Sequence, residues 1–225
     1  MTWPRVFFLL LLMVIPASLF FWWSEARREA SRPPGTVASR GGEAFDLVLT
    51  RPDLHFSQAD PSWGPLMLGG TRETIRSVGC TLCCTAMALR HFGIDTDPGR
   101  LNAALASSGG FTPQGWLVWG GLEQVSGNRV KVSVYRQPDL AELDAHLRRG
   151  DLVTVKFFLP LGIPHWVLVV GKRGQDYLIQ DPASRSADLI VLADRTPAIH
   201  SMRAISGTGG ANPSSPVSGV TALRD

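Results

Sequence analysis

The sequence predicts an α+β domain in which helices from the first half pack on a mainly antiparallel sheet from the second half. Two observations support this fold class: helical periodicity dominates before residue 125, and the β-rich runs all follow that residue. An order of helices first and strands second favours α+β packing. The 225 residues, 44% hydrophobic and 18% charged, suit one globular core.

The clearest helix is predicted over residues 81–91. This stretch lacks Pro and Gly, places Leu82, Ala86 and Leu89 at helical spacing, and is followed by Gly93, a natural stop. Three further helices are expected, the first beginning near Pro98, the second over 115–124 and the third over 138–149.

The strands are expected where β-branched and aromatic residues gather between turn signals. Five such runs are found. The first, at 129–135, follows the predicted helix at 115–124, and the others follow the predicted helix at 138–149, at residues 152–159, 165–171, 177–181 and 189–192.

Four segments are expected along the chain. Residues 1–23 form a membrane anchor or signal segment, 24–43 a flexible linker rich in Pro, Gly and Ser, 44–205 the folded domain, and 206–225 a disordered tail.

The first segment contains 18 uncharged residues at 6–23, about 27 Å of helix against a hydrocarbon core of about 30 Å. Trp22 and Trp23 favour a retained anchor, whereas a small-x-small pattern at 24–26 would suit cleavage of a signal peptide and secretion. More Arg residues follow the span than precede it, which by the positive-inside rule would keep the domain cytoplasmic. We nevertheless expect a membrane-anchored, extracytoplasmic domain.

The charge pattern argues against a nucleic-acid partner. The net charge of +3 and the isoelectric point near 9.0 are modest. No run of Lys or Arg alternates with aromatic residues. No nucleic-acid partner and no cofactor are expected, the membrane is an expected partner through residues 6–23, and the oligomeric state stays open.

All three cysteines lie within five residues, in "CTLCC" at 80–84. Cys80 stands at the start of a predicted helix, where the helix dipole and unpaired N–H groups lower the pKa of a thiol. Cys83 and Cys84 lie one turn further in, where cysteine behaves as a small buried hydrophobe. Cys80 is thus the candidate nucleophile, and partners are needed to support that role.

His165 is the candidate base, because it opens the apolar strand "HWVLVVG" and can project from the end of the sheet. The other four histidines are expected at a helix end or in solvent. Asp181 is the next acidic residue in an apolar setting. If a three- or five-residue loop joins the two strands, Asp181 shares a face with His165 and can orient the imidazole. Gln58, in a loop, offers an amide for an oxyanion.

Four segments, taken in order, resemble the papain-like cysteine peptidases related to the bacteriocin-processing, double-glycine leader peptidases. They are "SQADPSWG" (57–64), "GCTLCCTAMALRHFG" (79–93), "PHWVLVVG" (164–171) and "YLIQDP" (177–182). The resemblance implies a papain-like fold and a stand-alone thiol protease, without transporter domains, that hydrolyses peptide bonds. It implies Cys80 as nucleophile, His165 as base, Asp181 as orienting acid and Gln58 as oxyanion donor.

Two other functions stay open at this stage. The spacing of Cys80 and Cys83 also matches the CxxC of a thiol-disulfide oxidoreductase. A non-catalytic module could instead bind peptides or cell-wall material, with tryptophans such as Trp63, Trp116, Trp119 and Trp166 lining a groove. A metal site is not expected, because only Cys80 and Cys83 have ligand spacing and a second pair is absent.

Overall fold

The computed structural model describes residues 32–209, and the folded unit begins at Gly35. The predicted anchor at 6–23 and residues 210–225 of the predicted tail lie outside the described residues. Within the described part of the chain, no helix is long and apolar enough to cross a bilayer.

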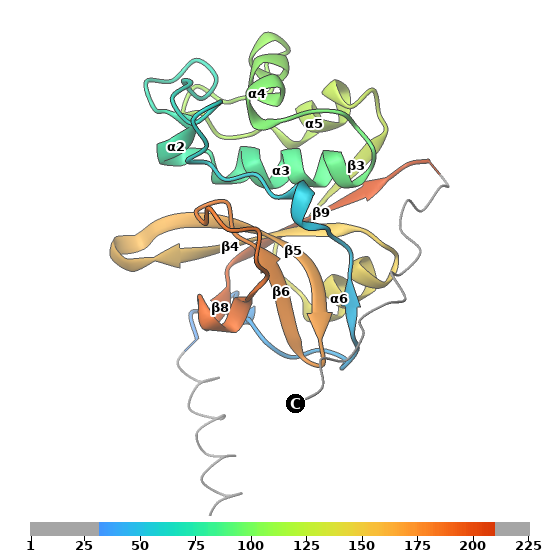
Figure 1. Cartoon of the computed structure of the whole chain (residues 1–225). Helices are drawn as coiled ribbons and strands as arrows, with labels where there is room; N and C mark the ends of the chain where they lie inside the picture. The colour runs from blue at the N-terminus through green and yellow to red at the C-terminus, as the bar shows by residue number, and fades with distance from the viewer. Residues whose placement is uncertain (1–31, 210–225) are drawn as a thin grey trace, which may run out of the picture. The chain divides into compact units, whose positions relative to one another are not determined.

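Helices α2 to α5 gather on one side of the sheet, and α6 lies apart from them (Figure 1). The helices are α2 (Ile75–Val78), α3 (Cys80–His91), α4 (Pro98–Ser107), α5 (Trp119–Val125) and α6 (Leu140–Arg148), with 3-10 turns at η1 (Pro52–Leu54), η2 (Pro160–Gly162) and η3 (Leu192–Asp194). Each predicted helix is present, but α5 begins at Trp119, four residues after the predicted start.

The main sheet has the strand order β3-β9-β4-β5-β6-β7, and β2 pairs with β5 beside this path. Every pair in it is antiparallel. The strands are β2 (Leu47–Val48), β3 (Val130–Val134), β4 (Leu152–Leu159), β5 (Ile163–Arg173), β6 (Asp176–Gln180), β7 (Ile190–Val191) and β9 (Ser201–Gly207). A separate two-stranded sheet joins β1 (Val37–Ala38) to β8 (Ala198–Ile199). The predicted α+β class, with a mainly antiparallel sheet, is confirmed.

Helix α3 is the central helix of the core and packs on β5. Ten of its twelve residues are buried, including Cys83 and Cys84. The sulfur of Cys84 lies 3.5 Å from the carbonyl oxygen of Trp166 on β5. A helix that is apolar on all sides is buried on all sides, so α3 is held rigidly between the sheet and the other helices.

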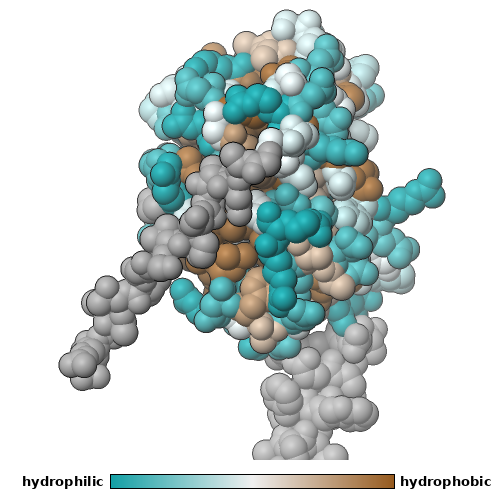
Figure 2. Space-filling view, turned by 90° about the vertical axis from the view of Figure 1, so that its right-hand side faces the viewer, coloured by the Kyte–Doolittle hydropathy of each residue, from teal (hydrophilic) through white to brown (hydrophobic). Residues whose placement is uncertain are grey.

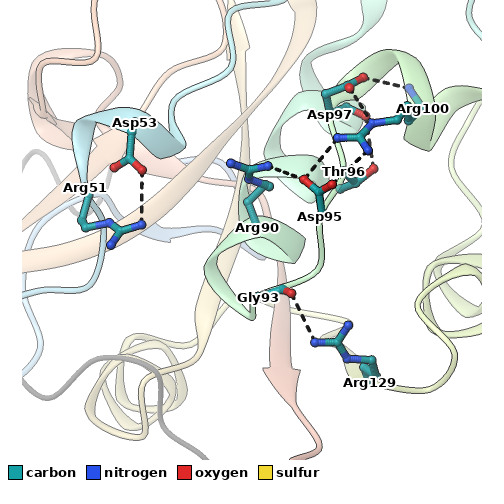
Figure 3. Close-up of polar contacts among 9 residues, drawn as sticks. All are labelled: Arg51, Asp53, Arg90, Gly93, Asp95, Thr96, Asp97, Arg100 and Arg129. Atoms are coloured by element: carbon teal, nitrogen blue, oxygen red, sulfur yellow. Dashed lines mark hydrogen bonds and ion pairs between the residues drawn. The ribbon is translucent and has the colours of Figure 1, made fainter.

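Exposed ion pairs fix the turn between α3 and α4 (Figure 3). Arg90 contacts Asp95 at 2.6 Å, and Arg100 contacts Asp97 at 2.7 Å. Asp97 also caps α4, because its Oδ1 accepts the backbone N–H of Arg100 at 2.9 Å. Exposed pairs of this kind contribute little to global stability, so their effect is on the local turn.

Two short stretches that composition assigns to the linker and the tail take part in the folded unit. Residues 37–38 pair with β8, and the backbone N–H of Glu43 donates to Asp144 at 2.7 Å. Residues 206–207 complete β9 opposite β3. Backbone hydrogen bonds hold both stretches, and a composition rich in Gly and Ser does not reveal such bonds.

A buried charged cluster anchors the N-terminal stretch to the sheet. Lys172 and Tyr177 lie opposite each other on β5 and β6, and both donate to Oδ1 of Asp144, at 2.6 and 2.8 Å. The side chains of Lys172 and Asp144 are 0% and 4% exposed. Because the ammonium and the carboxylate satisfy each other, the pair is tolerated inside the domain.

On the face shown in Figure 2, hydrophilic residues surround smaller hydrophobic areas. Among the described residues, three of the ten exposed large hydrophobic residues are Phe158, Leu161 and Ile163, in the hairpin between β4 and β5. Leu161 is 97% exposed and has a left-handed backbone, with φ of 66°. The tip of this hairpin is thus both apolar and conformationally unfavourable.

Candidate active site

Cys80 is the first residue of α3, immediately after the short helix α2 and Gly79. The first turn of a helix presents backbone N–H groups without intrahelical partners, and these carry positive partial charge. The local sequence enforces the position: a Cβ on Gly79 would lie 2.4 Å from the carbonyl oxygen of Ile75. Only glycine allows α2 to approach the start of α3 so closely.

His165 lies on β5 and is 4% exposed. Its Nε2 is 2.7 Å from Oδ1 of Asp181, which follows the last residue of β6. The ring of Phe157 on β4 packs edge-on against the imidazole, with the two ring centroids 5.4 Å apart. The imidazole is thus fixed by a carboxylate on one side and an aromatic ring on another.

A β-bulge in β5 places His165 and Asp181 on one face. The hairpin from β5 to β6 has a two-residue turn, with Arg173 paired to Asp176. That register alone would turn the two side chains to opposite faces, because side chains alternate along a strand. The shift between Val169 and Gly171 changes the register by one residue. The expected three- or five-residue loop is therefore wrong, while the expected shared face is found.

His165 is also the main partner that offsets burial at the Cys80 thiol. Since Nε2 contacts Asp181, Nδ1 is the ring atom left to interact with that thiol. Burial by itself would raise the pKa of the Cys80 thiol. The hydrogen bond and charge of His165, with the N–H of Trp166 and the hydroxyl of Thr81, outweigh burial and hold that pKa below its ordinary value.

The pKa of His165 moves in the opposite direction. Burial by itself would lower it, but the hydrogen bonds and charges of Asp181 and Cys80 raise the pKa to about 9. A lowered thiol pKa beside a raised imidazole pKa favours a thiolate and an imidazolium at neutral pH. This pair combines a strong nucleophile with a proton donor directly beside it.

Asp181 is 1% exposed, and its two oxygens have different partners. Oδ1 accepts from His165 and from the backbone N–H of Ala183, at 2.7 and 2.9 Å. Oδ2 accepts from Nη2 of Arg195 at 2.9 Å. Burial alone would raise the pKa of Asp181, but these hydrogen bonds and charges lower it, so the carboxylate is ionised at neutral pH.

Gln58 lies in a loop that is attached to the turn after Asp181. Its backbone N–H donates to the carbonyl of Pro182 at 2.8 Å. The side-chain Nε2 donates to the carbonyl oxygen of Arg76 at 2.7 Å, and Oε1 is buried without a hydrogen-bond partner in the described part of the chain. A carbonyl can only accept, so the nitrogen must face Arg76. The second N–H of the amide makes no hydrogen bond within the described part of the chain.

The loop around Gln58 is rigid because its own side chains close it. The indole N–H of Trp63 donates to the carbonyl of Ser57 at 2.8 Å, and the Trp63 ring packs edge-on against Phe56. A Cβ on Gly64 would lie 2.6 Å from the carbonyl oxygen of Asp60. These contacts explain the Trp and Gly of "SQADPSWG" as structural residues that hold the glutamine.

The other cysteines lack the environment of Cys80. Burial first, and then the charges of Cys80 and Asp60, raise the pKa of the Cys83 thiol. Burial likewise raises the pKa of Cys84 well above its ordinary value. All three cysteines are free. A CxxC oxidoreductase needs a second reactive thiol, and Cys83 is a poor one.

The expectation of solvated histidines outside the site is wrong for His146. It is 4% exposed and is held by Asp151 at 2.8 Å and by the hydroxyl of Tyr135 at 2.6 Å. His91 is also buried, at the end of α3, with Nε2 3.3 Å from the carbonyl of Gly150. In residues 32–209, no three His, Cys, Asp or Glu side chains are grouped as a metal site would need.

Arg195, which follows η3, is the residue of this constellation that sequence reasoning missed. It lies in the polar segment "LADRTP" at 192–197, where an arginine carries no pattern of its own. The four tryptophans considered as the lining of one groove have different environments. Trp119 packs on Trp166 with ring centroids 5.8 Å apart, whereas Trp116 is 71% exposed.

Comparison with known proteins identifies the family. Residues 73–191, more than half of the chain, match the model of the Peptidase C39 family. This range includes Cys80, His165 and Asp181 but not Gln58. A solved chain from Bacillus anthracis, described as a C39-like peptidase, is similar with a TM-score of 0.44 and 17% identity, covering 72% of this chain and 97% of that chain.

None of the curated proteins matches the sequence. The family match covers the helix that begins at Cys80 and the strands that carry His165 and Asp181, in a domain of helices and antiparallel strands. The chain therefore belongs to the Peptidase C39 family, and is a cysteine peptidase with the papain-like α+β fold.

Proposed function

We propose that the protein hydrolyses peptide bonds through Cys80, His165 and Asp181, with Gln58 as an oxyanion donor. The observation that carries the proposal is the imidazole of His165, which contacts Asp181 through Nε2 at 2.7 Å and whose hydrogen bond and charge lower the pKa of the Cys80 thiol. Nucleophile, base and orienting acid stand in the order that thiol-based acyl transfer requires.

In the proposed reaction, the Cys80 thiolate attacks the carbonyl carbon of the scissile bond. The oxyanion forms beside the free N–H of the Gln58 amide and the backbone N–H of Cys80 at the helix start. His165 donates its proton to the leaving amine, which departs and leaves an acyl group on the sulfur. His165 then removes a proton from water, and water releases the acyl group as a carboxylic acid.

The direct test is to capture the acyl-enzyme. Full-length protein is mixed with a peptide library at acidic and neutral pH, quenched, and digested. Mass spectrometry should find an acyl group on Cys80, and its mass identifies the residue before the cleaved bond. A Cys80→Ala variant should carry no adduct and cleave no peptide. Unchanged cleavage by that variant would reject the proposal.

The role of Gln58 needs its own variant. Removing one oxyanion donor costs about 10²–10³ in kcat, so Gln58→Ala should lose activity of that order while Cys80 still reacts with iodoacetamide. The matched control is Gln175→Ala, because Gln175 also donates to a backbone carbonyl, that of Gly42 at 3.3 Å, but in the β5–β6 turn. Equal losses in both variants would assign Gln58 to the loop structure only.

The proposal extends to location. The uncharged stretch at 6–23 would tether the peptidase to a membrane with the domain on the extracytoplasmic side, or would direct secretion if it is cleaved. The support is the length of that stretch and its two terminal tryptophans. Protease treatment of intact cells should digest a tethered domain, and complete protection would place it in the cytoplasm.

A further inference from the structure

Arg195 makes a short contact with the site that the proposed mechanism does not use. Its Nη2 donates to Oδ2 of Asp181 at 2.9 Å, and the Arg195 side chain is 38% exposed while that of Asp181 is 1% exposed. The guanidinium therefore reaches from the surface to a carboxylate inside the domain. The backbone at Arg195 is fixed, because the N–H groups of Arg195 and Thr196 both donate to the carbonyl of Leu192.

The contact divides the two oxygens of Asp181 between two functions. Oδ1 faces His165, and Oδ2 faces Arg195. A carboxylate held at both oxygens cannot rotate about its terminal bond without losing one partner. Its Oδ1 thus stays in the position where it accepts from the imidazole.

The charge of Arg195 acts in the same direction. Asp181 is buried, and a buried carboxylate without a cation tends to take up a proton. A protonated Asp181 could no longer stabilise an imidazolium, and the thiolate would lose its partner. Other titratable groups that act on this turn include His165 on β5, Cys84 on α3, whose thiol feels the charge of Asp181, and His55, whose Nε2 lies 3.1 Å from the carbonyl of Ser184. Unlike these groups, Arg195 carries a permanent positive charge.

We propose that Arg195 is a positioning residue of the catalytic machinery, which holds Asp181 ionised and oriented so that His165 and Cys80 remain an ion pair in mildly acidic solution. The inference rests on the proposed triad. It predicts that Arg195 sets the acidic limit of activity and takes no part in the bond changes themselves.

The test is the pH profile of Cys80 alkylation by iodoacetamide, measured on the full chain from pH 3 to 8 with Arg195→Gln and Arg195→Lys. An opposite charge within about 4–6 Å moves a pKa by 1–3. Because Arg195 is partly exposed, we expect Arg195→Gln to move the acidic midpoint upward by about half a pH unit to one unit. Arg195→Lys should recover at least half of that change, because it keeps the charge.

The outcomes separate this inference from the proposed triad. If wild-type alkylation is flat near neutrality and Arg195→Gln has the same acidic midpoint, the positioning role is wrong while the triad stands. A uniform loss of rate at every pH, with a lower unfolding temperature, would mean that Arg195 supports only the fold. If wild-type Cys80 itself behaves as an ordinary thiol that titrates near 9, the triad fails, whatever Arg195 does.

Discussion

Replacing His165 by glutamine should convert Cys80 into a thiol that is protonated at neutral pH. The pKa of His165 is raised from 6.5 to about 9, which corresponds to about 3 kcal/mol in favour of the imidazolium. Glutamine has a similar volume but no charge. The burial of Cys80 is then opposed only by the N–H of Trp166 and the hydroxyl of Thr81, and we expect burial to hold the thiol pKa above 9.0.

The size of the effect follows from the thiolate fraction. A thiol with a pKa of 9 is ionised in roughly one molecule in a thousand at pH 6, and this fraction rises about tenfold per pH unit up to pH 8. The alkylation rate of Cys80 in His165→Gln should follow that slope. In the wild type, His165 lowers the pKa of the Cys80 thiol, so the rate should rise less steeply than tenfold per pH unit between pH 6 and 8.

The assay is iodoacetamide labelling followed by peptide mapping, which reports on Cys80 separately from Cys83 and Cys84. The comparison uses the slope of the alkylation rate against pH. A thiolate of lower pKa is also a weaker nucleophile, so the absolute rates of wild type and His165→Gln need not differ strongly. The matched control is His146→Gln, which removes another buried histidine that is paired with an aspartate, and its slope should equal that of the wild type.

Two results would refute the reasoning. A wild-type slope of tenfold per pH unit would mean that no ion pair exists at neutrality. A flat slope in His165→Gln would mean that the helix start alone ionises Cys80. At higher pH the sign is also fixed: as the pH rises through about 9, His165 loses its proton. Peptide cleavage should then fall, because the leaving amine loses its proton donor, while alkylation continues.

Two further predictions concern stability. Lys172→Met leaves the Asp144 carboxylate buried without its cation and should cost about 3–5 kcal/mol in the free energy of unfolding by urea; a cost below about 1 kcal/mol would show that the cluster is not a stabilising anchor. Leu161→Asn places a residue that tolerates φ of 66° at the exposed hairpin tip and should stabilise by about 0.5–1 kcal/mol. A lower unfolding temperature for that variant would mean that Leu161 has packing partners within the protein.

The helices and the central strands could be predicted because their side chains carry the information. Helix α3 has apolar residues at helical spacing, and β4 and β5 are runs of Val, Leu and Phe that the core buries on both faces. The strands β1, β2 and β8 have two residues each. They form because the backbone groups of short segments find partners on other strands, and composition does not record those partners.

The site could be predicted in part for the same reason. Cys80 and His165 stand at the beginning of a helix and near the start of a strand, where a change of pattern is visible. The relation of His165 to Asp181 could not be derived, because it depends on a bulge between Val169 and Gly171. A Cβ there would lie 2.3 Å from the carbonyl oxygen of Leu47 on β2. The glycine is visible in the sequence, but the strand that passes over it is not.

Arg195 was beyond prediction for a different reason. The 13 residues between Asp181 and Arg195 include the short elements β7 and η3, and the partner of Arg195 is a single carboxylate oxygen. An arginine in a polar loop is usually solvated, and only the three-dimensional path of that loop brings this one to Asp181. Long-range side-chain pairs of this kind are lost to any reading that relies on local pattern.

The turn formed by Asp181 and Pro182 connects the two halves of the proposed mechanism. The side chain of Asp181 holds His165, and the carbonyl of Pro182 accepts the backbone N–H of Gln58. The base and the oxyanion donor are therefore attached to neighbouring residues of one turn. A displacement of that turn would move both groups at once, so the effects of substitutions at Asp181 and Gln58 should not add as independent contributions.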